Sequence, residues 1–320
     1  MTIAVTGATG FIGQPLCRAL RATGYQVRGV GRRPARDVHE FVIADLREPC
    51  PPDIFKDIEV VYALAADMGG VGYISQHPAQ VLHNNALITL HTIEAARLAG
   101  VRRYILASSA CVYPAGLQTG TLSYPLREAD AYPANPLYAY GWEKLLAERL
   151  CLEYAAAYGM ETRIARFHSV YGPCDAWTGG REKVPAAACR KIAEAVRAGR
   201  SSVAIFGDGS QVRSFCYVTD AVDALIRMRT SDYPGPINIG GDEPTTTAAL
   251  YRRIAAIAGL PRLTLVPQPA PPGVQHRLPD LALAASALHW TPTTGLQEGL
   301  EITYRWVAGQ LTDVVRKEAR

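Results

Sequence analysis

The chain has 320 residues, of which 48% are apolar, and a formal net charge of +4. This length suits one large domain or two closely packed ones. The mild, scattered charge argues against nucleic-acid or membrane-surface binding, and no apolar run approaches the ~20 residues of a membrane span. A strand-like segment begins almost at Met1, so we expect no signal peptide. The seven cysteines lack metal-site or disulfide spacing, which predicts reduced thiols, a cytoplasmic protein and no metal centre.

Strand and helix patterns alternate from the N-terminus, which predicts βαβ units in an α/β fold with a Rossmann-type doubly wound parallel sheet. In chain order, we expect strands over residues 3–6, 25–30, 41–44, 60–64, 104–107 and 161–166. We expect helices over 14–23, 84–98 and 136–158, each followed shortly by a glycine that can end it.

The pattern changes after residue 171. We expect a glycine-rich loop, a helix over 185–198, a strand over 204–206, a return to the sheet at 215–229 and 237–239, and a proline-rich loop at 267–272. This predicts a dinucleotide-binding Rossmann domain (residues 1–170 plus about 215–240). A smaller mixed α/β substrate domain would take 171–214 and 241–320. The ligand should lie in the crevice at the carboxyl ends of the strands.

A glycine motif follows the first strand, with Gly7, Gly10 and Gly13 around Phe11 and Ile12. Such a turn allows backbone N–H groups to approach a pyrophosphate at a helix N-terminus, which predicts a bound NAD or NADP. We expect Asp45 and Leu46, after the third strand, to contact the adenine.

The end of the second strand bears on the choice between the two cofactors. An acidic residue there would bind the ribose 2′-hydroxyl of NAD, but this chain has Arg32 and Arg33. Two guanidiniums suit a 2′-phosphate, so the sequence favours NADP.

A second group of residues predicts chemistry on an alcohol. Tyr140 and Lys144 share one helix face, and the positive charge of the lysine should lower the tyrosine pKa. Tyr140 could then take a proton while hydride leaves the same carbon, with Ser109 hydrogen-bonded to the same oxygen. Cys111 lies two residues past Ser109. Seen alone, a free cysteine is more often a small buried apolar side chain than a catalytic group.

These motifs resemble the extended short-chain dehydrogenase/reductase family of nucleotide-sugar enzymes, also called the NAD-dependent epimerase/dehydratase family. The similarity covers nearly the whole chain and is greatest to the branch that inverts C3 and C5 of GDP-mannose. It rests on the glycine motif, the Ser109, Tyr140 and Lys144 set, and the segments 65–70, 108–114, 166–168, 171–173, 179–183, 189–191, 207–209 and 213–215.

The resemblance implies transient oxidation at C4, proton exchange at C5 and C3, and re-reduction of C4 by a tightly bound, internally recycled cofactor. The product would be GDP-L-galactose, with GDP-L-gulose as a possible second product. Cys111 would be the base and Lys183 the opposing acid. The implied partners are a GDP-hexose and a second copy of the chain, joined through the helices at 84–98 and 136–158. The implied substrate-binding residues are Gly69, Gly70, Ser169, Glu182, Lys183, Lys191, Gln211, Arg213 and Arg277.

Two departures affect substrate binding in this comparison. Ser169 stands where members of that branch carry an asparagine, and the sequence around Arg277 follows theirs only loosely. Three alternatives therefore stay open: a 4-epimerase, a C3/C5 epimerase acting on another nucleotide sugar, and a non-catalytic dinucleotide-binding sensor. A 4,6-dehydratase is disfavoured, because Ala110 and Cys111 replace the Asp-Glu pair of those enzymes.

Overall fold

A seven-stranded parallel sheet forms the larger lobe of this computed structural model, which describes residues 1–120, 124–269 and 273–318. Its strands lie in the order β11-β6-β5-β4-β1-β2-β3. In chain order, they are β1 (Thr2–Thr6), β2 (Gln26–Gly31), β3 (Glu40–Ile43), β4 (Val60–Ala63), β5 (Arg103–Ser109), β6 (Glu161–Phe167) and β11 (Pro236–Ile239). Strands β2 and β3 were added on one side of β1, and β4 to β6 on the other, so the topological switch point lies between β1 and β4. Doubly wound sheets bind ligands at this point. The predicted fold class is confirmed.

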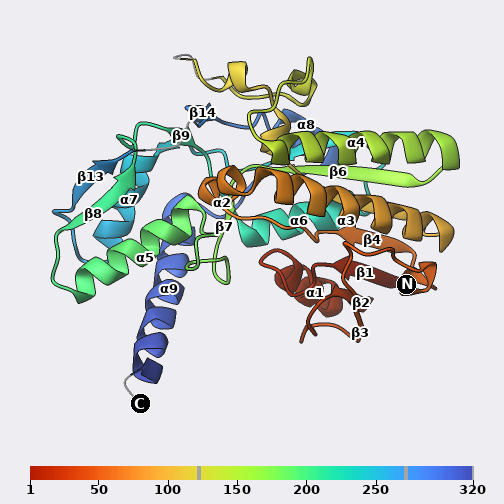
Figure 1. Cartoon of the computed structure of the whole chain (residues 1–320), viewed down its shortest axis with the longest axis horizontal. Coiled ribbons are helices and arrows are strands. Elements are labelled where there is room, and N and C mark those ends of the chain that lie inside the picture. Colours follow the sequence, from red (N-terminus) through yellow and green to blue (C-terminus); the bar gives the residue numbers. More distant parts are fainter. Residues whose placement is uncertain (121–123, 270–272, 319–320) are drawn as a thin grey trace.

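Helices cover both faces of this sheet (Figure 1). One layer contains α3 (Pro78–Leu98) and α4 (Ala139–Tyr158), which pack side by side, with the short α2 (Val71–Gln76) beside α3. The other layer contains α1 (Gly13–Ala22), α6 (Val218–Met228) and α8 (Ala282–Leu288).

The smaller lobe lies to the left in Figure 1 and is built around α5 (Val184–Arg197), α7 (Thr247–Ile257) and α9 (Leu296–Glu318). Short sheets flank these helices. They pair β8 (Ser202–Phe206) with β13 (Thr264–Gln268), β9 (Val212–Arg213) with β12 (Thr245–Thr246) and β14 (His276–Arg277), and β7 (Val170–Tyr171) with β10 (Cys216–Tyr217).

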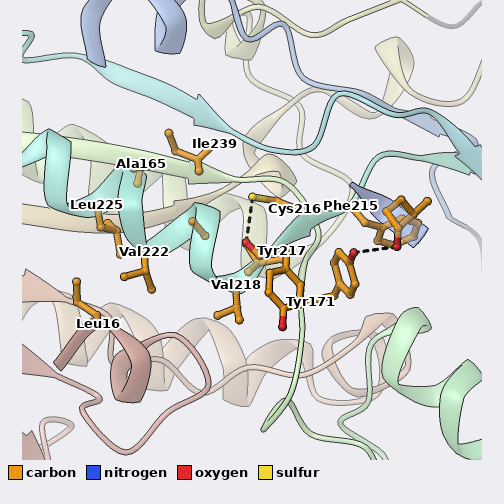
Figure 2. Packing of buried hydrophobic residues seen from close by; sticks show 14 of the residues in the cluster. Leu16, Ala165, Tyr171, Phe215, Cys216, Tyr217, Val218, Val222, Leu225 and Ile239 are labelled. Atoms are coloured by element: carbon orange, nitrogen blue, oxygen red, sulfur yellow. Dashed lines mark hydrogen bonds between the residues drawn. The ribbon is translucent and has the colours of Figure 1, made fainter. Parts of the chain in front are cut away.

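A buried cluster joins the lobes where β7 and β10 meet (Figure 2). The rings of Tyr171 and Tyr217 meet edge to face with centroids 5.6 Å apart, and the Tyr171 hydroxyl donates to Leu296 O of α9 at 3.4 Å. The same cluster contains Leu16 of α1. The helix that follows the glycine turn is thus packed into the same core as the start of the smaller lobe.

Several expected boundaries were wrong. The helix predicted at 84–98 begins at Pro78, because proline's fixed φ suits the first helical turn. The helix predicted at 136–158 begins only at Ala139. Residues 215–229 do not return to the main sheet as a whole, since Cys216–Tyr217 pairs with β7 and Val218–Met228 is helical.

The predicted start of the proline-rich loop, residue 267, was also wrong. Pro267 and Gln268 complete β13, an edge strand, where a proline can stand if it need not donate to the ladder. Residues 270–272 lie outside the described part of the chain. Among the described residues, no helix is both long and apolar enough to cross a bilayer.

Candidate active site

The glycine turn lies between β1 and α1. Gly7 has φ +67°, a left-handed conformation that favours glycine, and its N–H donates to Val30 O of β2 at 3.0 Å. A side chain at Gly13 would place its Cβ 2.2 Å from Gly7 O, so the turn can close only without one. Backbone N–H groups at the start of α1 are thereby left accessible to an anion. This cradle fits a dinucleotide pyrophosphate.

The residues expected near the adenosine lie beside this turn. Arg32 and Arg33 are both exposed directly after β2. The Asp45 carboxylate accepts from Arg47 Nε at 2.9 Å, and this hydrogen bond is the largest cause that lowers the Asp45 pKa to about 2. The Leu46 side chain is buried in the core, so only its backbone could reach an adenine.

Ser109, Cys111 and Tyr140 come together at the carboxyl end of β5. Tyr140 and Cys111 belong to one buried cluster that Met68 also joins, and the Tyr140 hydroxyl donates to Met68 Sδ at 3.6 Å. The Lys144 ammonium lies 5.5 Å from the centre of the Tyr140 ring. The predicted Ser-Tyr-Lys set is therefore assembled in one place.

We predicted a lowered pKa for Tyr140, and the structure shows the opposite direction. Burial raises the pKa of Tyr140 well above its ordinary value, and Glu143 raises it further, although hydrogen bonding by Ser109 opposes this. The Lys144 ammonium lies 3.5 Å from Glu143 Oε1. Sequence reasoning missed Glu143, a buried carboxylate that would otherwise have read as ordinary helix surface.

Cys111 is held on three sides. Its N–H donates to Ser109 Oγ at 3.1 Å, and a side chain at Gly141 would come within 2.1 Å of Cys111 O. Arg277 Nη1 donates to Cys111 Sγ at 3.4 Å, and Arg277 Nε donates to Gln118 Oε1 at 2.7 Å. We predicted Arg277 as a nucleotide-binding residue, and the structure places its guanidinium on the thiol. Gln118, 1% exposed, was not predicted.

Arg213 lies next to Arg277, since the two residues pair across β9 and β14. Three backbone carbonyls accept from its guanidinium, including Val274 O at 2.6 Å. Burial, with a smaller contribution from Arg277, lowers the Arg213 pKa to about 9. Two neighbouring guanidiniums beside the site are suited to a diphosphate or another anion.

Lys183 lies immediately before α5, on the side of the site that carries the glycine turn. Its Nζ is 5.0 Å from the centre of the Phe11 ring and 3.6 Å from Asp175 Oδ2. Glu182, which we predicted as a substrate-binding residue, lies 3.6 Å from Arg190 Nη2. Sequence reasoning missed Asp175, because it follows a turn and matches no motif.

The Gly69–Gly70 segment after β4 packs against the Lys183 loop. A side chain at Gly70 would meet Glu182 O at 2.2 Å, and Gly70 N donates to Arg181 O at 2.9 Å. A side chain at Gly69 would meet the ring of Tyr73. These glycines are therefore required by contacts within the chain itself, whether or not a sugar also approaches them.

The other predicted binding residues lie around this centre. Ser169 has φ +45° and its carbonyl accepts from Cys216 N at 3.3 Å. Lys191 Nζ donates to Ala204 O at 2.8 Å, beside a surface hollow lined by Arg190 and Arg200. Gln211 O accepts from Thr247 N at 2.9 Å. No contact joins these three side chains to Cys111 within the described residues.

A buried polar network lies beside the segment that carries Cys111. Arg166 Nη2 donates to Glu148 Oε2 at 2.7 Å, and Arg166 Nη1 donates to the Tyr113 hydroxyl at 3.3 Å. That hydroxyl donates to Asn238 Oδ1 of β11 at 2.6 Å, and His168 Nε2 meets the same oxygen at 2.9 Å. Burial lowers the His168 pKa to about 3. The network ties β6, β11 and α4 to the segment that carries Cys111.

Comparisons with known proteins agree with this geometry. Residues 3–240 match the NAD dependent epimerase/dehydratase family. The chain is 39% identical to the GDP-mannose 3,5-epimerase of Arabidopsis thaliana, over 97% of this chain and 83% of that protein. The structure of UDP-glucose 4-epimerase from Thermotoga maritima, with UDP-glucose, matches with a TM-score of 0.86 at 26% identity, over 97% of this chain and 100% of that one.

MoeE5 in complex with UDP-glucose and NAD matches with a TM-score of 0.83 at 33% identity, over 97% of this chain and 100% of that one. The family resemblance seen in the motifs is thus confirmed by independent comparisons of sequence and of structure. The chain belongs to the NAD dependent epimerase/dehydratase family.

Proposed function

We propose that the chain is a GDP-mannose 3,5-epimerase that forms GDP-L-galactose, with GDP-L-gulose as the 5-epimer. The observation that carries this proposal is Cys111, which lies in one buried cluster with Tyr140 and has the Arg277 guanidinium on its sulfur. A simple 4-epimerase needs no base beside the Ser-Tyr-Lys set. The identity to the Arabidopsis enzyme supports the same substrate.

Each residue has a defined task in this reaction. Tyr140 takes the proton of the C4 hydroxyl while Ser109 hydrogen-bonds the same oxygen and Lys144 supplies positive charge. A nicotinamide cofactor held by the glycine turn supplies a hydride acceptor and donor. The 4-ketone acidifies the hydrogens on C3 and C5. Cys111 removes a proton from one face of the sugar, and Lys183 returns one to the other.

The nucleotide would lie toward the smaller lobe. Arg213 and Arg277 offer adjacent positive charge for the diphosphate, and Lys191 lies farther out on α5. We propose that residues 171–214 and 241–320 act as the substrate domain on this basis, with 1–170 and about 215–240 as the cofactor domain.

Proton exchange tests this function directly. GDP-mannose incubated with the enzyme in D2O should gain deuterium at C5 and C3, detected by NMR. Cys111→Ser should abolish this exchange while the protein still binds its cofactor. Absence of deuterium from both carbons would exclude the proposed reaction, and full activity of Cys111→Ser would favour a 4-epimerase.

The cofactor proposed is NADP, tightly bound and recycled within each turnover. The exposed Arg32 and Arg33 after β2 support a 2′-phosphate, whereas the structural relative MoeE5 holds NAD. Denaturing the purified protein and identifying the released nucleotide by mass decides between them. Release of NAD would show that the two arginines do not select the phosphate.

We also propose a homodimer in the cytoplasm. Trp142 and Leu146 of α4 and Leu82 and Leu90 of α3 are exposed apolar side chains on two adjacent helices. A second copy could cover them with the same two helices. The seven free cysteines support a reducing compartment.

A further inference from the structure

Asp175 is a buried carboxylate in the loop between β7 and α5. Its side chain is 9% exposed, and Oδ1 accepts the N–H of Ala176 at 3.0 Å. Oδ2 is fully buried and has no hydrogen-bond partner among the described residues. A charged group in such a place is costly unless a counter-charge lies close by.

The counter-charge is Lys183. Its Nζ lies 3.6 Å from Asp175 Oδ2 and donates to Val170 O at 3.4 Å. The face of Phe11, from the glycine turn, completes the surroundings at 5.0 Å from the ring centre. The ammonium thus has contacts with β7, with the loop that follows β7 and with the glycine turn.

Glu182 is the other carboxylate that could serve Lys183, being its neighbour in sequence. Its Oε1 faces Arg190 Nη2 at 3.6 Å instead. Burial raises the Asp175 pKa, and the nearby Lys183 charge and the Ala176 N–H oppose this shift. Asp175 is thus the carboxylate that lies beside the Lys183 ammonium, at 3.6 Å.

We propose that Asp175 is the positioning residue for the acid Lys183, an inference that rests on the proposed epimerase function. In the protonation step an N–H bond of the ammonium breaks and its electron pair stays on nitrogen. The carbanion pair of C5 or C3 forms the new C–H bond. The neutral amine must then regain a proton from solvent before the next inversion. The Asp175 carboxylate keeps Nζ on its face of the site through each such cycle.

Two rates measured in one D2O experiment isolate this role. Cys111 alone can remove a proton and return deuterium to the same face, which labels recovered GDP-mannose without inversion. Inverted product requires Lys183 as well. Asp175→Asn keeps an oxygen for the Ala176 N–H but removes the charge. We expect it to lower formation of inverted product by about tenfold or more, as expected for a lost charge-assisted contact, while retained-configuration exchange continues.

The same samples supply the controls. Reduction of bound nicotinamide on adding GDP-mannose, read by absorbance, reports the C4 step and the integrity of the fold. Asp223→Asn removes a surface carboxylate paired with Arg227 at 2.8 Å and should leave every rate unchanged.

Two results would overturn the inference. One is a ratio of inversion to exchange in Asp175→Asn equal to that of the wild type. The other is an equal fall in inversion, exchange and nicotinamide reduction, which would assign Asp175 to the fold alone. A wild-type protein that incorporates no deuterium at C3 or C5 would instead reject the proposed function itself, and the role of Asp175 with it.

Discussion

Arg277 of the smaller lobe contacts the sulfur of Cys111, the proposed base, in the larger lobe. Its guanidinium is fixed by Gln118 and directed at Cys111 Sγ. A guanidinium at this distance orients the sulfur through a charge-assisted hydrogen bond. The two residues are 166 positions apart in sequence, so no local pattern could have predicted the contact.

Replacing Arg277 should therefore change the reactivity of the thiol. We expect Arg277→Gln to slow alkylation of Cys111 by iodoacetamide by about tenfold, because a hydrogen bond to a charged group contributes ~1.5 kcal/mol. Peptide mass spectrometry measures the rate at each cysteine, and the exposed Cys174 serves as internal control. Equal rates for Cys111 in both proteins, after normalisation to Cys174, would contradict the prediction.

At the scale of the element, the turn after β4 connects two parts of the site. It brings Gly70 against the backbone of Glu182, next to Lys183, the proposed acid. The glycine pair was predicted from sequence as a place where a sugar passes the backbone. The contact with the 181–183 loop could not be predicted, because it depends on how two distant loops pack.

Gly70→Ala tests this packing, with Gly72→Ala as the matched control. The first places a Cβ 2.2 Å from Glu182 O and should displace the Lys183 loop, lowering kcat by at least about tenfold. The second, in α2, has no atom within 4 Å of the added Cβ and should raise stability by up to ~1 kcal/mol. Steady-state kinetics and urea unfolding measure the two effects, and similar kcat values for both variants would argue against the packing role.

The buried network behind β5 and β6 predicts a pH dependence of stability. The pKa of His168 is near 3 in the folded protein, against 6.5 ordinarily, so the unfolded chain binds the proton first as pH falls. The free energy of unfolding should thus decrease as the pH is lowered from about 6.5. This histidine should contribute a slope that approaches ~1.4 kcal/mol per pH unit. His168→Gln should remove that contribution in urea unfolding between about pH 7 and pH 4.

His289→Asn is the control for this measurement. His289 is exposed and has φ +49°, a conformation that asparagine also adopts readily. Its replacement should leave the pH dependence as it is in the wild type. A slope that persists unchanged in His168→Gln would show that other groups produce it.

For the whole molecule, periodicity and glycine placement were enough to predict the larger lobe. The glycine turn, the alternating strands and Tyr140 with Lys144 are local features, and each lies where it was expected. In the smaller lobe, the helix over 185–198 and the strand over 204–206 were predicted and correspond to α5 and β8. The helices α7 and α9, which pack on α5, were not predicted. Asp175 and Gln118 act through contacts that local patterns do not show, and Glu143 differs from an ordinary helix-surface carboxylate only by its burial.

The exposed apolar face of α4 allows the proposed dimer to be tested. We expect the combined Trp142→Glu and Leu146→Glu variant to sediment as a monomer, because two charges on the exposed face of α4 would oppose its burial against a second copy. Ile43→Glu, at the exposed edge strand β3, should leave the association state unchanged. A mutant with the sedimentation coefficient of the wild type would rule out this face as the interface.

The position of β11 has a consequence for synthesis on the ribosome. This strand pairs with β6, but residues 168–235 separate the two in the chain. A nascent chain that ends just after β6 exposes an edge of unpaired backbone groups, and it lacks Asn238, which hydrogen-bonds the segment behind Cys111. The seven-stranded sheet is therefore completed only after residues 168–235 have been made, and no single cut separates the larger lobe from the smaller one.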